Sequence, residues 1–166
     1  VDIGANAQFK SEAIEGDVDV NGISDQINRL TTRIARANLD IATIEGGGLT
    51  RNDATGLRDQ RYRDLEELAE LININIQEQE SGAVAVFVGG DYIISNGTSR
   101  DVYAAQNKSL NGTEVRIVET DSPLQVTSGK LASSMLARDE VFGNYADNLD
   151  KVASALRSEE HTSELQ

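Results

Sequence analysis

The sequence predicts an α+β fold: an elongated helical bundle, formed by a helical hairpin and a long return helix, with a small inserted antiparallel β unit. Three features carry this prediction: an apolar stripe with helical spacing in the first third of the chain, a second such stripe near its end, and a middle section in which apolar and polar residues alternate. Spacings of three and four residues align side chains on one side of a helix, whereas a period of two is typical of a strand. A helix with such a stripe must pack it against another element.

The first stripe predicts one long helix from about Gln8 to Ile44. Its residues are alternately four and three positions apart, which is the spacing of helices that pack along a seam. We call the following residues the first seam: Ile23, Ile27, Leu30, Ile34, Ala37, Ile41 and Ile44. The glycines at 46–48 are expected to end the helix, because glycine accepts the left-handed backbone found just past a helix end.

A second helix is predicted to follow Asn52 and Asp53, whose short polar side chains are suited to capping a helix N-terminus. The principal apolar positions of this helix are Leu57, Leu65, Leu68 and Ile72. Because the join to the first helix is short, the two helices should form an antiparallel hairpin.

The period then changes from 3.6 to 2, which predicts strands. The alternating apolar residues are Ile72, Ile74 and Ile76 in one run and Val84, Val86 and Val88 in the next. We expect the first run to be a strand with one wet face and the second to be its partner. Further short strands are predicted at 92–94, 102–103 and 115–118, and Asn96 with Gly97 is a strong turn signal. Together they suggest a small antiparallel sheet or an open barrel.

The second stripe predicts a final helix, capped by Thr127 or Ser128 and ending at Leu156. We call its residues the second seam: Leu131, Met135, Arg138, Phe142, Tyr145, Leu149, Val152 and Leu156. This helix is expected to return along the hairpin and complete a three-helix bundle. Two interpretations of Arg138 remain open. The preferred one is that its aliphatic stem is buried while its guanidinium reaches water, and the other is that it pairs with Asp59 or Asp64.

The chain therefore divides into a stem at 1–72, a β unit at 73–127 and a return helix at 128–156. The ten residues 157–166 match a sequencing-library adapter translated in frame, and we interpret them as a tail that is not native. The chain begins at Val1 without a signal-peptide pattern, so we interpret it as a fragment.

The composition argues against several classes of function. The 166 residues carry a net charge of −13, which argues against nucleic acid and against anionic membranes as partners. Cysteine is absent, and the only histidine, His161, lies in the tail, so a thiol nucleophile, a histidine base and a zinc site have no candidates. We therefore predict a protein that is not an enzyme, with no catalytic, cofactor-binding or metal-binding residues.

Five motifs follow one another in an order that identifies a family: the run 27–38, the glycines at 46–48, the second helix, a hairpin at 83–90 and the start of the last helix at 129–139. Their order and spacing over roughly residues 20–156 resemble the flagellar hook-associated protein 1 family, the proteins of the hook–filament junction. The motif residues that carry the resemblance most directly are Asn52, Asp53, Leu57, Arg58, Asp59, Gln60, Arg61, Gly89, Gly90, Arg138 and Asp139.

The resemblance implies a structural subunit of the bacterial flagellum that forms the junction between hook and filament and is needed for flagellum assembly. It implies export through the flagellar secretion channel and a place outside the cell. The partners that it implies are copies of the chain in a ring, the flagellar hook protein and the second hook–filament junction protein. It is also compatible with an export chaperone as a further partner. Assembly in this family rests largely on terminal helices that we expect to be missing here, so the fragment should fold without polymerising.

Two other readings remain open at this point. The chain could be a surface-exposed binding or adhesion module whose β unit presents Tyr92, Ile93 and Tyr103 to a partner. It could also be another axial protein such as a flagellin, although a flagellin would not be expected to carry the Asp59 to Arg61 motif or the Gly89 and Gly90 hairpin.

Overall fold

The computed structural model describes residues 3–46, 54–107 and 112–163, which form three helices and six strands. The helices are α1 (Ile3–Gly46), α2 (Thr55–Leu71) and α3 (Gly129–Ser163). The strands are β1 (Asn75–Glu78), β2 (Val84–Val88), β3 (Asp91–Ser95), β4 (Thr98–Ser99), β5 (Val102–Asn107) and β6 (Gly112–Ile117). Helices and antiparallel strands occupy separate parts of the chain, so the predicted α+β class is confirmed.

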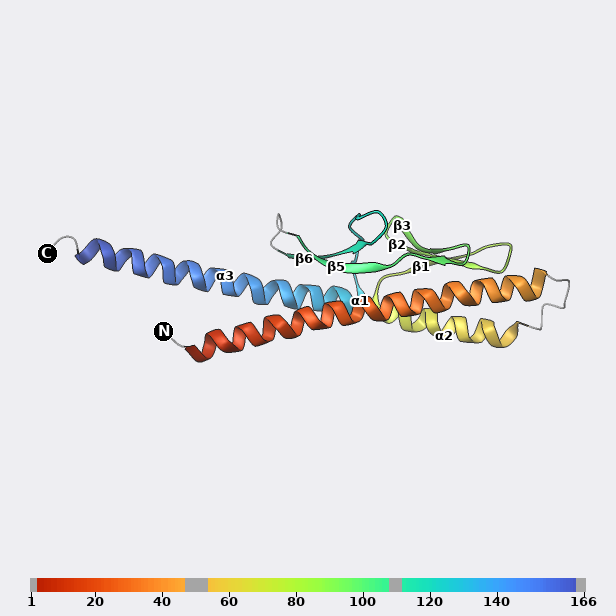
Figure 1. The fold of residues 1–166 in the computed structure, drawn as a ribbon, viewed down its shortest axis with the longest axis horizontal. Helices are drawn as coiled ribbons and strands as arrows, with labels where there is room; N and C mark the ends of the chain where they lie inside the picture. Colours follow the sequence, from red (N-terminus) through yellow and green to blue (C-terminus); the bar gives the residue numbers. More distant parts are fainter. Residues whose placement is uncertain (1–2, 47–53, 108–111, 164–166) are drawn as a thin grey trace.

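Helix α1 is the spine of the molecule. Helix α2 packs against its C-terminal half and α3 packs against its N-terminal half, as Figure 1 shows. Both α2 and α3 run opposite to α1 and lie nearly end to end. The last helix is therefore placed differently from the prediction: it does not return along the hairpin but continues the line of α2, so the three helices do not lie side by side as one bundle.

The position of α3 is fixed by its first residue, Gly129, which packs against the end of α2. Gly129 has a φ of +89° and lies so close to the end of α2 that an added Cβ would be 2.6 Å from the carbonyl oxygen of Leu71. The Asn73 side-chain amide donates to the carbonyl oxygen of Gln125 (3.2 Å), and its oxygen accepts from the amide of Thr127 (2.8 Å). The β unit thus leaves and rejoins the helices at one place.

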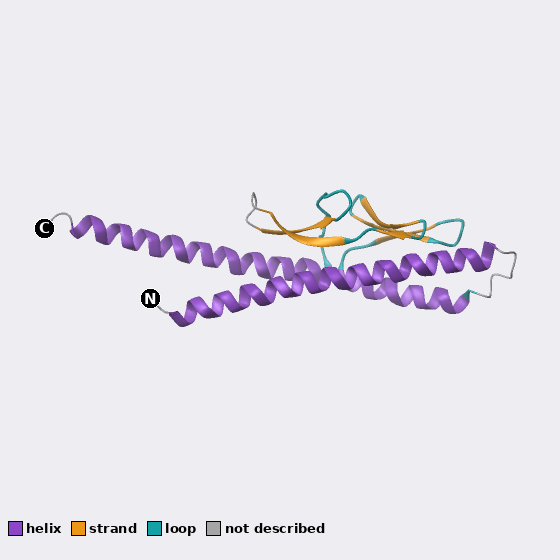
Figure 2. Ribbon diagram, viewed as in Figure 1, coloured by secondary structure: helices purple, strands orange, loops and turns teal. Residues whose placement is uncertain are grey.

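The strands form two antiparallel groups, a four-stranded sheet in the order β1-β2-β3-β4 and a two-stranded ribbon of β5 and β6. Strand β2 pairs with β1 as predicted. Asn96 and Gly97 join β3 to β4 with φ values of 49° and 79°, as a hairpin turn of the primed type requires. The two groups lie along one side of the helices in Figure 2, so of the two predicted alternatives the small antiparallel sheet is present, accompanied by a separate two-stranded ribbon, and the open barrel is not formed by the described strands.

The first strand begins later than predicted. Ile72 is the buried C-cap of α2, and β1 begins only at Asn75. All four residues of β1 are exposed, including Ile76, so the alternation does not mark a buried face here. The physical reason is position: β1 is an edge strand, paired on one side only.

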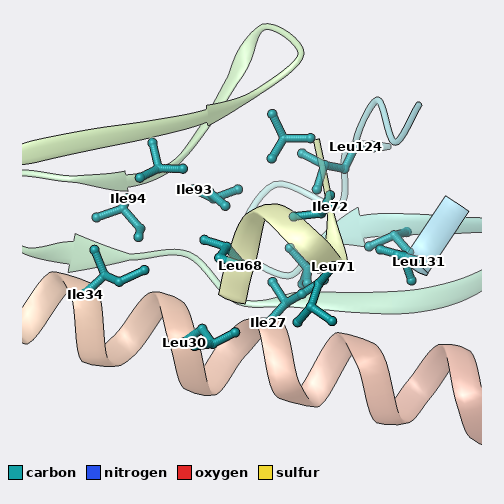
Figure 3. Close-up of a cluster of buried hydrophobic side chains, with 14 of the residues drawn as sticks. Ile27, Leu30, Ile34, Leu68, Leu71, Ile72, Ile93, Ile94, Leu124 and Leu131 are labelled. Atoms are coloured by element: carbon teal, nitrogen blue, oxygen red, sulfur yellow. The ribbon is translucent and has the colours of Figure 1, made fainter. Parts of the chain in front are cut away.

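One continuous core joins the stem to the β unit. Figure 3 shows Ile27, Leu30 and Ile34 of α1 close to Leu68 of α2 and Ile94 of β3. Valines of β2, β5 and β6 and Leu131 of α3 belong to the same buried cluster. The β unit is therefore a layer on the helices and shares its core with them.

The helix ends differ in detail from those predicted. Helix α1 begins at Ile3 and ends at Gly46, while the glycines at 47 and 48 lie outside the described residues, as do Asn52 and Asp53. Ala54 is the N-cap of α2, without a side-chain capping bond. Helix α3 begins at Gly129 and continues past Leu156 to Ser163, into the ten residues interpreted as a tail.

Replacing Gly129 with alanine should destabilise the protein strongly. The left-handed backbone costs a residue with a Cβ roughly 1–2 kcal/mol, and the contact with Leu71 adds to this cost, because a backbone atom cannot move aside alone. The matched control is Gly143→Ala, also in α3 but with open space around it, which should stabilise the helix by about 0.5–1 kcal/mol. Urea unfolding followed by circular dichroism measures both; equal stability of the two variants would contradict this account.

Candidate functional site

The candidate functional site lies where the β unit packs against the helices, because one buried core joins the two. No group of three or more histidine, cysteine, aspartate or glutamate side chains gathers there as a set of metal ligands. None of the described helices combines the length and the apolar character that a membrane crossing requires. The candidate functional site is therefore the set of contacts that fixes the β unit on the stem, which we call the stem–sheet interface.

The first seam supplies the apolar part of this interface. Its residues from Ile23 to Ile41 are buried, and Ile44, near the end of α1, is half-buried. On α2, Leu65 and Leu68 are buried and Leu57 is half-buried. The buried residues of the first seam therefore belong to the same core as α2 and the sheet.

Among the described side chains of the second seam, those near its beginning are buried or half-buried and the later ones are exposed. Leu131 is fully buried and Met135 packs against the core, whereas Leu149 and Val152 are 49% and 48% exposed. The side chains of Phe142 and Tyr145 lie outside the described part of the structure. The ribbons of α1 and α3 separate toward the two termini in Figure 1, which explains why Leu149 and Val152 do not reach the core.

Two asparagines of α1 bind backbone at strand edges in the way that a neighbouring strand would. The Asn38 amide nitrogen donates to the carbonyl oxygen of Val84 (2.8 Å), and its oxygen accepts from the Val84 amide (3.0 Å). Asn28 does the same for Val102 of β5, at 2.9 and 2.8 Å. Each asparagine thus satisfies both polar groups of one strand residue and fixes the position of that strand on α1.

Arg61 of α2 completes the interface at Asn38. Its side chain is fully buried, and Nη1 donates to Asn38 Oδ1 (2.9 Å) and to the carbonyl oxygen of Gly82 (2.8 Å). Its Nε and Nη2 have no hydrogen-bond partner within the described residues. Burial, and secondarily the nearby charge of Arg58, lowers the pKa of Arg61 from its usual value. One guanidinium therefore links α2, α1 and the β1–β2 turn.

The other residues of the α2 motif lie mostly at the surface. Arg58 pairs with Glu45 (2.7 Å) and Glu78 (3.5 Å), and the bond to Glu45 raises the pKa of Arg58. Asp59 is exposed, and exposed Gln60 donates to Asp64 (3.0 Å). The motif thus divides into two arginines that connect elements and two exposed polar residues.

Gly89 and Gly90 form the turn between β2 and β3. Gly89 has a φ of +60°, and a Cβ there would be 2.8 Å from Cβ of Gln125. Gly90 has nothing within 4 Å of an added Cβ. Only Gly89 is therefore required by close packing, against the segment that leads back to α3.

Asp139 of α3 bonds to the ribbon, and Arg138 beside it is buried. Asp139 Oδ1 accepts from the Thr113 amide at the start of β6 (2.7 Å), and the absence of a Cβ at Gly112 makes room for it. Arg138 is only 8% exposed and its Nε is buried, so little of its guanidinium reaches water, in contrast to the preferred prediction of a buried stem with its head in water. Asp64, one of the two candidate partners, is bonded to Arg33 (2.8 Å).

The aromatic surface expected of a binding module is only partly present. Ile93 is fully buried, which contradicts the prediction that it faces a partner. Tyr92 and Tyr103 are partly exposed, but the Arg100 guanidinium lies 3.7 Å from the centroid of the Tyr92 ring. The Tyr103 hydroxyl donates to Asp121 (2.5 Å). The Tyr92 ring and the Tyr103 hydroxyl are thus already engaged within the β unit.

Hydrogen bonds and ion pairs around Asp121 and Glu114 stabilise the ribbon at neutral pH. The bond from Tyr103, and then that from Arg116, lowers the pKa of Asp121, while bonds from Arg116 and then Asn107 lower the pKa of Glu114. A carboxylate with a depressed pKa adds stability above its ordinary pKa and loses it as pH falls through the folded value. The contribution of both groups is therefore present at neutral pH and lost in acid.

Asn28, Asn38 and Asn73 were not predicted from the sequence as interface residues. Asn28 and Asn38 each follow a seam residue directly, so they lie at the border of the buried stripe. A polar side chain at such a border is a usable signal, because a buried amide must find partners. The identity of those partners has no local signal, since they are 74 and 46 positions away in sequence.

Comparisons with known proteins agree with this geometry. The family model of the flagellar hook-associated protein FlgK helical domain matches residues 5–160. The structure of the flagellar hook junction protein FlgK from Burkholderia pseudomallei is similar to this chain, with a TM-score of 0.65 and 20% sequence identity over 82% of this chain. At that identity the likeness shows the fold alone, and this chain spans only 26% of that protein. Among curated proteins no match was found.

Removing the Asn38 side chain should cost more stability than removing that of Asn28. Asn38→Ala leaves both polar groups of Val84 unpaired in the core and removes one acceptor of Arg61. Unpaired buried groups cost about 1–3 kcal/mol each, so a loss of roughly 3 kcal/mol is expected. Asn28→Ala, whose bonds are only partly buried, is the matched control with a smaller loss. Denaturant unfolding of both variants measures the difference; a larger loss for Asn28→Ala would contradict the burial argument.

Substitutions of Arg61 should separate its volume from its hydrogen bonds. Arg61→Ala removes both and should destabilise by about 3 kcal/mol. Arg61→Met restores most of the volume without burying a charge and should recover a large part of that loss. Thermal unfolding followed by circular dichroism gives the order. If methionine were no better than alanine, the bonds to Asn38 and Gly82 would dominate and the packing account would be wrong.

Proposed function

We propose that this chain, which belongs to the family of the flagellar hook-associated protein FlgK helical domain, is a structural segment of the junction between hook and filament in a bacterial flagellum. The observation that carries the proposal is the family match over residues 5–160, almost the whole chain. A role in flagellum assembly for the larger protein follows from this proposal.

The geometry supports a mechanical role. An axial structure that transmits torque needs parts that keep their shape, and here a sheet is fixed on a 44-residue helix by paired amide bonds and a shared core. A well-packed interior resists deformation because its side chains interlock at high density. The stem–sheet interface therefore gives the segment a rigid cross-section.

The partners in this proposal are neighbours along the axis of the flagellum. They are further copies of the same protein in a ring, the flagellar hook protein on one side and the second hook–filament junction protein on the other, with an export chaperone before assembly. The protein would reach its place outside the cell through the flagellar secretion channel. The net charge of −13 disfavours nucleic acid and anionic membranes as further partners.

The role can be tested in bacteria that lack the gene for the hook–filament junction protein and are complemented with the whole protein that contains this segment. The unchanged protein should restore filaments and swimming. Gly129→Ala should reduce both, because it disturbs the junction of α2 and α3, whereas Gly143→Ala should restore them fully. Filament counts by electron microscopy and motility in soft agar provide the measurements. Full motility with the segment deleted would reject the proposed role.

The isolated segment should fold without assembling. We expect residues 1–156 to be a helical monomer by light scattering and circular dichroism, because its principal seam residues are buried within one chain. The same fragment, fluorescently labelled, should fail to bind at the ends of isolated hooks. Incorporation of the fragment at the junction would show that the segment alone carries the assembly contacts.

A further inference from the structure

Strand β1 leaves one side of its backbone free of partners among the described strands. The register pairs Gln77 with Ala85, and the next bonded pair outward is Gln79 with Ala83, at 2.8 Å. Bonded and non-bonded pairs alternate along an antiparallel ladder. The amides and carbonyls of Ile76 and Glu78 therefore point away from β2, toward the open edge of the sheet.

At several places in the described structure, outward backbone groups of other strands are bonded to neighbouring segments. The free groups of Val84 bind Asn38, and those of Val102 bind Asn28. On the outer side of β6, the carbonyl oxygen of Val115 accepts from the Leu124 amide (2.8 Å). An open edge is a template for pairing with another chain, and no such bond is found on the outer side of β1 among the described residues.

The side chain of Ile76 adds an apolar contact to this edge. Ile76 lies opposite Val86, and Val86 lies opposite Ile94, so the three share one face of the sheet. Val86 and Ile94 are fully buried, whereas Ile76 is 46% exposed. The row of core side chains therefore ends at an uncovered isoleucine, which a residue on one further strand would cover.

The charges around the edge indicate the chemistry of the partner. Beside the end of β1 is a hollow of about 430 Å³, lined by Glu45, Arg58, Glu78, Gln79, Glu80 and Gly82. Three carboxylates and one arginine give this hollow an acidic excess. Arg58 is held mainly by Glu45 at 2.7 Å, and Glu80 is exposed. A lysine or arginine side chain entering the hollow would find carboxylates to pair with.

We propose that the β1 edge binds a basic, extended segment of another protein by strand addition. Backbone bonds to Ile76 and Glu78 hold the segment, an apolar side chain covers Ile76, and a basic side chain enters the hollow near Glu80. This inference goes beyond the proposed flagellar role and does not depend on it, because it rests only on the register, exposure and charge at β1.

A pair of synthetic peptides tests the proposal on the full 166-residue chain. One short peptide alternates valine with lysine, and its matched control alternates valine with glutamate. With the lysine peptide, hydrogen exchange of the Ile76 and Glu78 amides should slow at least about tenfold, since exchange reports local protection. The Gln77 amide, which already points toward β2, should change less. The glutamate peptide should leave all three unchanged.

Proline at position 76 provides the control variant. Ile76→Pro removes an amide that points outward, so β1 should stay paired with β2 while peptide binding is lost. The double substitution Glu78→Gln and Glu80→Gln should remove the preference for lysine over glutamate. Absence of protection by either peptide, undiminished binding to Ile76→Pro, or protection that appears in the protein alone as its concentration rises would each overturn the proposal, the last because the occupant would then be a second copy.

Discussion

The approach of Gly129 to the carboxyl end of α2 is the constraint on which the rest of the structure depends. Because no Cβ is present, α3 can begin against the backbone of Leu71 and Ile72 and continue in the direction of α2. That position leaves the N-terminal half of α1 as the surface on which α3 packs. It also forces the strands to start and finish at one place, where Asn73 bonds to both Gln125 and Thr127. The β unit is consequently a closed excursion beside the stem.

A sheet that lies on a helix has strand edges that water cannot easily reach, and their polar groups need partners. Here the partners are side chains of the spine itself. Asn38 and Asn28 each bond to both backbone groups of one residue, so the sheet and the ribbon are aligned along α1 by hydrogen bonds as well as by apolar contact. Apolar packing is tolerant of small sliding movements, whereas a paired amide bond fixes one position. This combination is suited to a segment whose shape must be preserved under load.

The sequence alone predicted what depends on local periodicity. The spacing of the first seam identified α1, alternation identified the pairing of β1 with β2, and Asn96 with Gly97 identified a hairpin. Features that depend on residues far apart in the sequence were not predicted. A seam requires a neighbour but does not say which half of α1 provides it, so α3 was expected alongside the hairpin. Alternation cannot distinguish a central strand from an edge, which is why the exposure of Ile76 differs from expectation. Ile93, which the binding-module alternative placed at the surface, is buried. The bonds of Asn28 and Asn38 join residues 74 and 46 positions apart and leave no nearby pattern.

Arg61 shows why the interface between α1, α2 and the β1–β2 turn has a single register. Burying a cation without a carboxylate partner is unfavourable, and well-packed apolar residues often serve stability better. One guanidinium nitrogen of Arg61 donates both to Asn38 of α1 and to the carbonyl oxygen of Gly82 in the β1–β2 turn. If α2 slid along α1 by a turn, the charge would stay buried and lose both acceptors. The cost of burying Arg61 therefore falls mainly on misaligned packings, so the residue selects the native alignment even where it adds little to its stability.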